Sequence, residues 1–397
     1  MGKTLIIGQS GGPTSVINAS LVGVIKEALK HEEIDRVLGS FHGIDGILNS
    51  NYYTFTENDN LDLLTTTPAA ALGSVRFKLT NDFSDPIYQQ ILDKFIEYNV
   101  GYFFYIGGND SMDTCNKLSQ YFSERNIDIK VIGVPKTIDN DLVHTDHSPG
   151  YGSAAKYVAT TLSEIAEDIN VYKKGRVTIV EIMGRDAGWL TAAAKLANLN
   201  HQYIDLIYLP EVAFNVEDFL DKVKDIYNKK QKVLVAVSEG IKDKDDNYIL
   251  KYRNFNNNDS FGHMQLGGVA QVLAEIVSQK LGISVRSIEL NLPQRCASHI
   301  ASLTDVKEAL NCGKYAVKYA LKGQTGVMIG MFRNNNKISY KTTKLSQIAN
   351  YIKEFPKDWI VDGCNISDDY VDYALPLIQG ESSPKFKNGL PVYYKLK

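Results

Sequence analysis

Residues 132–141 read Ile-Gly-Val-Pro-Lys-Thr-Ile-Asp-Asn-Asp, so an apolar run ends in two carboxylates that flank an amide. The apolar residues favour a strand, and the polar residues then lie at its carboxyl end. Phosphoryl transfer requires a group that accepts the proton of the acceptor hydroxyl, and cations that neutralise the donor phosphates. Asp139 and Lys136 are groups of these kinds. For this segment alone, the alternative is a loop in which Asp and Asn only stabilise a turn.

Two further apolar strands, at residues 3–7 and 101–106, end in glycine turns that lead into helices. The first turn carries Gly11 and Gly12, and the second carries Gly108. Glycine lets backbone N–H groups approach an anion closely, and the N-terminus of a helix favours negative charge. The first turn is neither a Walker loop nor a GxGxxG fingerprint, which disfavours an NAD-dependent oxidoreductase. Because the carboxyl ends of parallel strands meet at one crevice, the turns together predict one phosphate site.

These segments resemble, in order, the signatures of the 6-phosphofructokinase family, and the resemblance extends from residue 5 to about residue 331. The matching segments are Gly11-Gly12, Gly107-Gly108-Asn109-Asp110-Ser111, Pro135-Lys136-Thr137-Ile138-Asp139-Asn140-Asp141 and Met183-Gly184-Arg185. The ATP-using branch typically has glycine where this chain has Asp110 and Lys136, whereas the pyrophosphate-using branch has Asp and Lys. The chain therefore resembles the pyrophosphate-using branch. The resemblance implies reversible transfer of a phosphoryl group from pyrophosphate to O1 of fructose 6-phosphate, which gives fructose 1,6-bisphosphate and phosphate.

The side chains of Asp110 and Lys136 also offer a physical reason for that choice of donor. A carboxylate and an ammonium in place of two glycines fill the space of an ATP α-phosphate, and the carboxylate repels its charge. Lys136 offers a point charge to the smaller donor. An ATP-dependent 6-phosphofructokinase is the alternative within this class. A non-catalytic sugar-phosphate sensor is the alternative from another class, although a sensor has no use for Asp139 beside Lys136.

The resemblance implies a role for each matching residue. Asp139 is expected to act as general base on the C1 hydroxyl, and Asp141 to help orient the site. The expected catalytic set is Asp110, Lys136, Asp139, Asp141 and Arg185. Pyrophosphate is expected to bind Gly11, Gly12, Arg76, Gly108, Ser111 and Lys136. Fructose 6-phosphate is expected to bind Thr137, Ile138, Asp139, Arg176, Met183, Gly184, Arg185, Glu239, Arg286 and Arg295.

The expected cofactor is Mg²⁺, and its assigned protein ligands are Asn109 and Asp110. The family most often has aspartate at the position of Asn109. An amide oxygen is adequate for a hard cation but weaker than a carboxylate, so the ion would rely more on Asp110, Asp139, waters and pyrophosphate oxygens.

Two segments compete for the family's last sugar-phosphate motif. Residues 262–268 read Gly-His-Met-Gln-Leu-Gly-Gly and resemble the family's Gly-His-x-Gln-Arg-Gly-Gly, but they lack the arginine. Arg286 and Arg295 are nine residues apart, as in the family, and Leu292 then takes the usual histidine position. We therefore prefer Arg286 and Arg295, and expect His263 in a turn that precedes the next helix.

The alternation of strands and helices predicts an α/β fold of two doubly wound domains with mainly parallel sheets. At 397 residues, the chain also exceeds what one core usually supports. The donor domain is expected at residues 1–142 and about 299–335, and the fructose 6-phosphate domain with a C-terminal extension at 143–298 and about 336–397. The active site would lie in the cleft between them. The tail from residue 333 has weak periodicity and predicts a packed extension rather than chemistry.

Composition limits the location and the partners. A net charge of −3 and a pI near 6.2 leave no broad basic face for nucleic acid. The apolar runs are too short to span a bilayer, no signal peptide precedes the first strand, and the cysteines show no CxxC spacing. A cytoplasmic enzyme is therefore expected. In the family, arginines of the sugar-phosphate site often come from a neighbouring subunit, so Arg176 and Arg286 imply a homo-oligomer, either a dimer or a tetramer.

Overall fold

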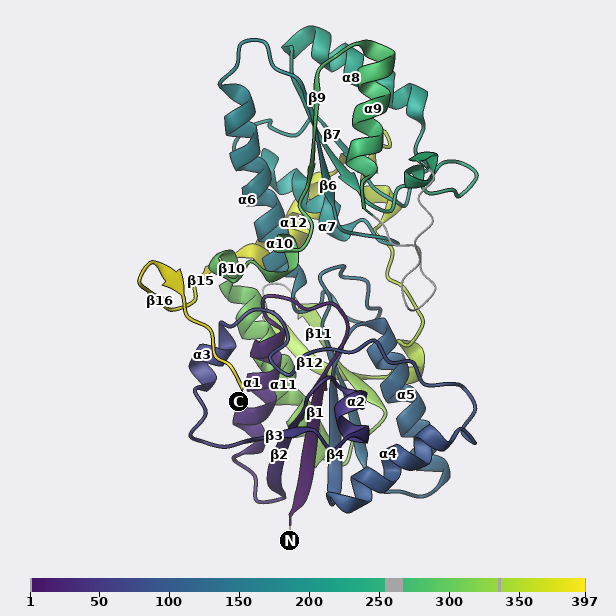
Figure 1. The fold of residues 1–397 in the computed structure, drawn as a ribbon, viewed down its shortest axis with the longest axis vertical. Coiled ribbons are helices and arrows are strands. Elements are labelled where there is room, and N and C mark those ends of the chain that lie inside the picture. Colours follow the sequence, from purple (N-terminus) through teal and green to yellow (C-terminus); the bar gives the residue numbers. More distant parts are fainter. Residues whose placement is uncertain (1, 254–266, 335–336, 397) are drawn as a thin grey trace.

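Within the residues that the structure describes, the larger sheet has seven strands in the order β12-β11-β5-β4-β1-β2-β3. The structure is a computed structural model, and it describes residues 2–253, 267–334 and 337–396 (Figure 1). The parallel strands of this sheet are β1 (Lys3–Gln9), β2 (Ile34–Ser40), β4 (Val100–Gly107), β5 (Lys130–Pro135) and β11 (Val327–Asn334). The outer strands β3 (Tyr52–Phe55) and β12 (Lys337–Lys344) pair antiparallel with their neighbours.

Alternate residues of the central strands pack on opposite faces of this sheet, so that Leu5 and Ile7 of β1 join one core and Ile6 joins another. The first core includes the helices α1 (Ile17–Ala28), α3 (Leu61–Thr65) and α11 (Leu303–Leu321). The second includes α2 (Ile44–Leu48), α4 (Pro86–Glu97) and α5 (Asn109–Glu124). Helices α1 and α11 cross closely, because a Cβ atom at Gly23 would lie 2.0 Å from the carbonyl oxygen of Leu310. In Figure 1 the carboxyl ends of β1 and β4 point toward the second lobe.

The smaller sheet is parallel, with the order β7-β8-β6-β9. Its strands are β6 (Val177–Ile182), β7 (Leu206–Tyr208), β8 (Val233–Ser238) and β9 (Val285–Glu289). The helices of this lobe are α6 (Tyr151–Asn170), α7 (Trp189–Ala192), α8 (Val216–Lys230), α9 (Val269–Leu281), α10 (Pro293–Cys296) and α12 (Asp368–Ala374). The carboxylate of Glu181 caps α9 by accepting hydrogen bonds from the N–H groups of Gly268 at 3.0 Å and Ala270 at 2.9 Å. The two mainly parallel sheets confirm the predicted α/β class.

The remaining elements are short strand pairs and 3₁₀ helices. The strand pairs are β10 (Ala301–Ser302) with β15 (Glu381–Ser382), β13 (Ile360–Val361) with β14 (Asn365–Ile366), and β16 (Phe386–Lys387) with β17 (Leu390–Pro391). The 3₁₀ helices are η1 (Ala193–Asn198), η2 (Ile249–Arg253), η3 (Ser298–Ile300), η4 (Leu345–Gln347), η5 (Lys357–Trp359) and η6 (Leu375–Ile378). A search of the described residues finds no helix with the length and apolar character needed to cross a membrane.

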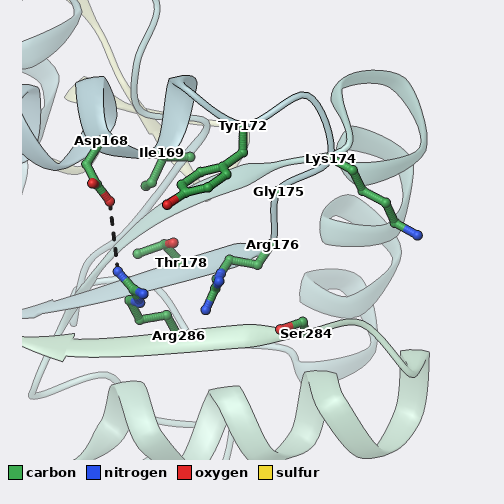
Figure 2. A pocket seen from close by; sticks show the side chains of 9 residues that line it. All are labelled: Asp168, Ile169, Tyr172, Lys174, Gly175, Arg176, Thr178, Ser284 and Arg286. Atoms are coloured by element: carbon green, nitrogen blue, oxygen red, sulfur yellow. Dashed lines mark ion pairs between the residues drawn. The ribbon is translucent and has the colours of Figure 1, made fainter.

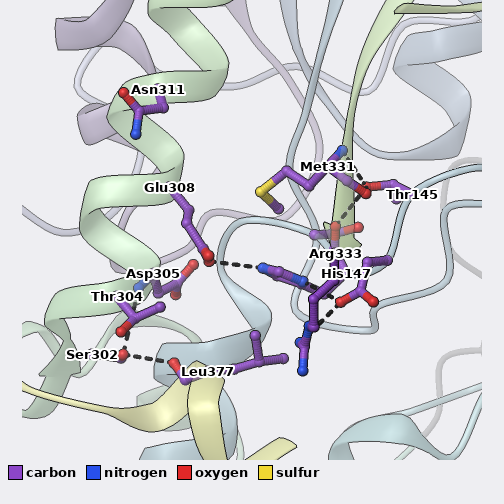
Figure 3. Close-up of polar contacts among 12 residues, drawn as sticks. Thr145, His147, Ser302, Thr304, Asp305, Glu308, Asn311, Met331, Arg333 and Leu377 are labelled. Atoms are coloured by element: carbon purple, nitrogen blue, oxygen red, sulfur yellow. Dashed lines mark hydrogen bonds and ion pairs between the residues drawn. The ribbon is translucent and has the colours of Figure 1, made fainter. Parts of the chain in front are cut away.

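The loop at residues 136–150 joins β5 to α6, and carboxylates contact both ring nitrogens of its buried His147. The Nδ1 atom lies 2.7 Å from Asp146 Oδ1, and the Nε2 atom lies 2.7 Å from Glu308 Oε2 on α11 (Figure 3). Arg333 of β11 lies 2.9 Å from the same oxygen of Asp146. Burial alone lowers the pKa of His147, but the two carboxylates raise it overall. The loop is thereby anchored to the first lobe.

The tail divides between the lobes and so differs from the predicted domain boundary. Residues from about 336 were predicted in the second domain, yet β12 pairs antiparallel with β11 in the first sheet, with Val327 opposite Lys344 and Asn334 opposite Lys337. Helix α12 does pack in the core of the second lobe. The chain then returns to the first lobe, where the Tyr394 hydroxyl donates a 2.8 Å hydrogen bond to Asp59 and its N–H donates a 2.9 Å bond to Thr67.

Candidate active site

The glycine turn after β1 and Lys136 after β5 meet at the carboxyl edge of the first sheet. Gly11 has a φ of 74°, a backbone conformation that favours glycine. The Lys136 ammonium donates a hydrogen bond of 2.6 Å to the carbonyl oxygen of Gly12. A Cβ atom at Gly11 would lie 3.3 Å from the same nitrogen, so this cation fills the space beside the turn. Lys136 is 3% exposed, and its charge therefore faces the turn rather than bulk solvent.

The loop that carries Asp139 and Asp141 has a backbone set by hydrogen bonds. The Asp139 N–H donates a 3.0 Å bond to the Thr137 hydroxyl. Asn140 has a φ of 55°, which asparagine tolerates better than most residues. The side-chain oxygen of Asn140 accepts a 3.0 Å bond from the N–H of Ser148. An asparagine between two carboxylates is therefore what this turn needs, and its conformation decides where the two carboxylates lie.

Burial dominates the electrostatics of this loop. It raises the pKa of Asp139 to about 7. The carboxylates of Asp141 and Glu239 add to that shift, and Lys136 opposes it. Burial lowers the pKa of Lys136 to about 8, although the two aspartates pull it upward. A carboxylate whose pKa lies near neutrality is suited to accept a proton from a hydroxyl at physiological pH.

The second glycine turn places three further predicted residues, Gly108, Asp110 and Ser111, at the start of α5. Gly107 has no room for a side chain, because a Cβ atom there would lie 1.9 Å from the hydroxyl oxygen of Ser111. Ser111 is buried, whereas Asp110 is exposed in the first turn of the helix. The backbone N–H of Lys136 donates a 3.0 Å hydrogen bond to the Gly107 carbonyl. The N-terminus of α5, which carries Asp110, therefore lies beside the loop that begins at Lys136.

Asn109, which the sequence assigns to the metal, uses its amide to hold the C-terminal tail. Its side-chain oxygen accepts a 2.6 Å hydrogen bond from the N–H of Asn350, and its side-chain nitrogen donates a 2.5 Å bond to the carbonyl of Tyr351. Among the described residues, no three carboxylate, histidine or cysteine side chains gather closely enough to hold a metal ion. These groups fit a Mg²⁺ ion that takes most of its ligands from phosphate groups and water, with Asp110 as the protein carboxylate.

Met183, Gly184 and Glu239 of the second lobe follow the carboxyl ends of β6 and β8, and the Glu239 carboxylate lies near enough to Asp139 to raise the pKa of Asp139. Gly184 has a φ of 145°, and its N–H lies 3.3 Å from Glu239 Oε1. The N–H of Met183 donates a 3.1 Å bond to the side-chain oxygen of the buried Gln294. Gln294 therefore fixes the backbone of the predicted sugar-phosphate segment.

Arg295 of α10 lies beside the glycine turn of the first lobe. A Cβ atom at Gly12 would lie 3.1 Å from a guanidinium nitrogen of Arg295, so this arginine of the second lobe touches the glycine turn of the first. Burial raises the pKa of Glu239, and the charges of Arg185 and Arg295 oppose that shift. The cleft thus holds cations from both lobes close to its buried carboxylates.

Arg176 and Arg286 lie at the opposite end of the second sheet. Arg176 precedes β6 and Met183 follows it, and at about 3.3 Å per residue the two ends of the strand are roughly 20 Å apart. Figure 2 shows both arginines lining one pocket, with Arg286 3.9 Å from the carboxylate of Asp168. One chain therefore brings Arg295, but neither Arg176 nor Arg286, to the cleft of Asp139.

The remaining predicted residues differ in how directly they face the cleft. The side chain of Ile138 packs in the apolar core of the second lobe, which leaves its backbone as the part that can meet a ligand. Arg76 is exposed, and the hydroxyl of Ser74 ties its segment to the Gly11 carbonyl at 2.7 Å. The predicted turn at His263 lies outside the described residues.

Three residues beside the site were not singled out from the sequence. Gln294 precedes the predicted Arg295, and that position was the available signal. The ammonium of Lys353 lies 3.4 Å from the side-chain oxygen of Asn140. The hydroxyl of Tyr373 accepts a 2.8 Å hydrogen bond from the side-chain nitrogen of Asn140. Lys353 and Tyr373 lie in the tail, where no sequence motif marks them.

Glycine turns, a carboxylate loop and arginines that meet at the carboxyl ends of parallel strands define a phosphoryl-transfer site in a doubly wound α/β protein. The sequence model of the family described as Phosphofructokinase matches residues 4–320. The chain therefore belongs to the phosphofructokinase family, as the resemblance of its motifs indicated.

Similar proteins match nearly the whole chain. The pyrophosphate–fructose 6-phosphate 1-phosphotransferase of Halomonas elongata is 38% identical over 399 residues, which cover 98% of this chain and 94% of the relative. The protein of the same name from Xanthomonas campestris pv. campestris is 40% identical over 405 residues, which cover 99% and 96%. The solved structure of a pyrophosphate-dependent phosphofructokinase from Nitrosospira multiformis has a TM-score of 0.90 at 37% identity, and the match covers 100% of this chain and 97% of that chain.

Proposed function

We propose that the protein transfers a phosphoryl group reversibly from pyrophosphate to O1 of fructose 6-phosphate, giving fructose 1,6-bisphosphate and phosphate. The observation that carries the proposal is the Lys136 ammonium, which lies 2.6 Å from the Gly12 carbonyl where the ATP-using branch has glycine. The names of the relatives from Halomonas elongata and Xanthomonas campestris support the same donor. Formation of fructose 1,6-bisphosphate from the two substrates tests the proposal, and absence of this product would exclude it.

Asp139 acts as the general base of this reaction. It accepts the proton of the C1 hydroxyl while O1 forms a bond to one phosphorus of pyrophosphate. The bond from that phosphorus to the bridging oxygen breaks, and the leaving phosphate keeps the electron pair. The Lys136 ammonium offsets the charge that develops on the leaving phosphate. In the reverse direction phosphate attacks, and the protonated Asp139 returns its proton to O1.

We propose Mg²⁺ as the cofactor, as the resemblance of the motifs to the family implies, because phosphoryl transfer needs cations that neutralise the donor phosphates. When bound, the ion supplies positive charge that neutralises the phosphate oxygens. Asp110 would hold it, together with the lone pair that the Asn109 side-chain oxygen does not use toward Asn350.

The free enzyme is expected to have a narrow pH optimum between about 7 and 8, from the pKa values of Asp139 and Lys136. Transfer needs the Asp139 carboxylate, so kcat/KM for fructose 6-phosphate rises as pH rises through about 7. It also needs the Lys136 ammonium, so kcat/KM falls as pH rises through about 8. Lys136→Arg keeps its charge at alkaline pH and should lose the alkaline decline. A decline of kcat/KM at the same pH in this variant would show that deprotonation of Lys136 does not cause the alkaline decline.

We also propose that the sugar-phosphate site is completed by a second copy of the chain. The position of Arg176 and Arg286 roughly 20 Å from the cleft of their own chain supports this, because one strand separates them from Met183. A phosphate contact from a neighbouring subunit would require an oligomer for activity. The proposal covers a dimer and a tetramer alike.

Arg176→Ala should raise the KM for fructose 6-phosphate about 10-fold or more and leave that for pyrophosphate nearly unchanged, because a charge-assisted contact contributes about 1.5–3 kcal/mol. Lys173→Ala, which removes an exposed lysine, is the matched control, and its KM values for both substrates should equal those of the wild type. At a fructose 6-phosphate concentration near the wild-type KM, mixing Arg176→Ala with Asp139→Ala subunits should give more activity than the two variants show separately. Equal effects of Arg176→Ala on both substrates, or no recovery on mixing, would contradict the shared site.

A further inference from the structure

Residues 350–355, here called the strap, run from the first lobe to the second beside the catalytic loop (Figure 1, yellow-green). At the first-lobe end, both polar atoms of the Asn109 amide bond the strap backbone, at 2.5 and 2.6 Å. At the second-lobe end, the N–H of Phe355 donates a 3.0 Å bond to Glu211, whose carboxylate also accepts a 2.7 Å bond from Gly188. The strap is therefore fixed at the start of α5 and again near the start of α7.

Between these anchors, Lys353 contacts the catalytic loop through its backbone and its side chain. Its N–H donates a 2.8 Å bond to the Asp141 carbonyl, and its carbonyl accepts a 2.9 Å bond from the indole of Trp189. Its ammonium donates a 2.9 Å bond to the Asp146 carbonyl and lies 4.9 Å from the centre of the Trp189 ring. Burial lowers the pKa of Lys353 to about 8, against the pull of Asp146 and Asp141.

The side chains of two tail residues, Lys353 and Tyr373, contact the side chain of Asn140. Its side-chain oxygen lies 3.4 Å from the Lys353 ammonium, and its side-chain nitrogen donates a 2.8 Å bond to the Tyr373 hydroxyl. The same hydroxyl donates a 2.7 Å bond to the Asp146 carbonyl. Both contacts come from residues beyond position 320, where the match to the family model ends. The tail, predicted to be a packed extension, therefore supports the loop that carries Asp139.

We propose that Lys353 and Tyr373 are positioning residues, which hold Asn140 and thereby set the places of the carboxylates on either side of it. The inference rests on the proposed function, because it takes Asp139 as the base. The positive φ of Asn140 is a conformation that surrounding contacts must maintain. Without those contacts the loop relaxes and Asp139 shifts away from O1, and a displacement of about 1 Å can lower a rate about 100-fold. Substrate affinity depends on other groups and should change little.

The test compares Lys353→Met, which removes the ammonium but keeps the side-chain length, with Tyr373→Phe, which removes one oxygen. We expect kcat to fall about 10- to 100-fold in Lys353→Met and less in Tyr373→Phe, with each KM within about threefold of wild type. Lys353→Arg keeps the charge and should recover part of the lost kcat. Lys344→Met removes an exposed lysine at the end of β12 and should keep the wild-type kcat.

The same assay tests the contact of Asn109 with the first-lobe end of the strap. Asn109→Asp replaces the side-chain nitrogen, which donates to the Tyr351 carbonyl, by an oxygen that cannot donate. This variant should lower kcat, because the strap loses one hydrogen bond and the new carboxylate oxygen repels the Tyr351 carbonyl. An undiminished kcat in a folded Asn109→Asp protein would overturn the anchoring role of Asn109.

Wild-type kcat in folded Lys353→Met and Tyr373→Phe proteins would overturn the proposal. A loss of thermal stability with equal changes in kcat and KM would also overturn it, because a merely structural role has that signature. If Lys353→Met does not fold, Tyr373→Phe decides alone. Absence of turnover in the unmutated protein is a different result, because it contradicts the proposed function rather than the strap.

Discussion

Asp139→Asn is expected to lower kcat by roughly 10²- to 10⁴-fold while the KM values for both substrates stay nearly unchanged. The reason is that a general base acts chiefly in the transition state, when the proton of the C1 hydroxyl is transferred. The substitution keeps the size of the side chain and the 3.0 Å bond from the Asp139 N–H to Thr137, so the loop should keep its backbone.

Steady-state kinetics at saturating Mg²⁺ give both parameters, and the thermal unfolding midpoint verifies the fold. Asp141→Asn is the informative comparison, because it removes the neighbouring negative charge that raises the pKa of Asp139. That variant should move the acid side of the kcat/KM profile to lower pH. Near-normal turnover in a folded Asp139→Asn protein would remove Asp139 from the mechanism.

The second large effect concerns Lys136, whose loss should lower kcat with pyrophosphate by roughly 10²- to 10³-fold, as expected for removal of one preorganised donor. Lys136→Gly also leaves the glycine turn without the cation that lies 2.6 Å from the Gly12 carbonyl. Asp110→Gly should instead admit some ATP activity, because it removes bulk and negative charge from the expected place of the α-phosphate. The double variant should accept ATP best, although its turnover stays low.

Initial rates with each donor at saturating fructose 6-phosphate measure these effects. Lys136→Arg keeps the charge and should retain more pyrophosphate activity than Lys136→Gly. If neither glycine variant changes the ratio of pyrophosphate to ATP activity, the two side chains do not select the donor.

The first-lobe half of the site could be predicted because its residues are close in sequence. Lys136 and Asp139 lie in one loop after β5. One glycine turn follows the neighbouring strand β4, and the other follows β1, which is the next strand along the sheet. A βα turn is a local structure, and the convergence of strand ends at one edge follows from the parallel fold. The structure adds that Lys136 is buried and that Asn140 has a positive φ, which the sequence did not predict.

Contacts across long stretches of sequence could not be predicted in this way. Lys353 lies 3.4 Å from Asn140 although the two are 213 residues apart, and a lysine in an aperiodic tail reads as a solvated side chain. Arg176 was expected to bind fructose 6-phosphate together with Met183. Arg176 precedes β6 and Met183 follows it, so the two residues lie at opposite ends of the strand. The pairing of β12 with β11 was missed because the tail was judged by its weak periodicity alone.

The measurement that tests the central claim most directly is the donor preference of the unmutated protein, with pyrophosphate and ATP compared at saturating fructose 6-phosphate and Mg²⁺. We predict rapid formation of fructose 1,6-bisphosphate with pyrophosphate and little or none with ATP, because the resemblance to the family implies that the side chains of Lys136 and Asp110 take the space that an ATP α-phosphate would need. Turnover with ATP equal to or greater than turnover with pyrophosphate would contradict the account and favour an ATP-dependent 6-phosphofructokinase.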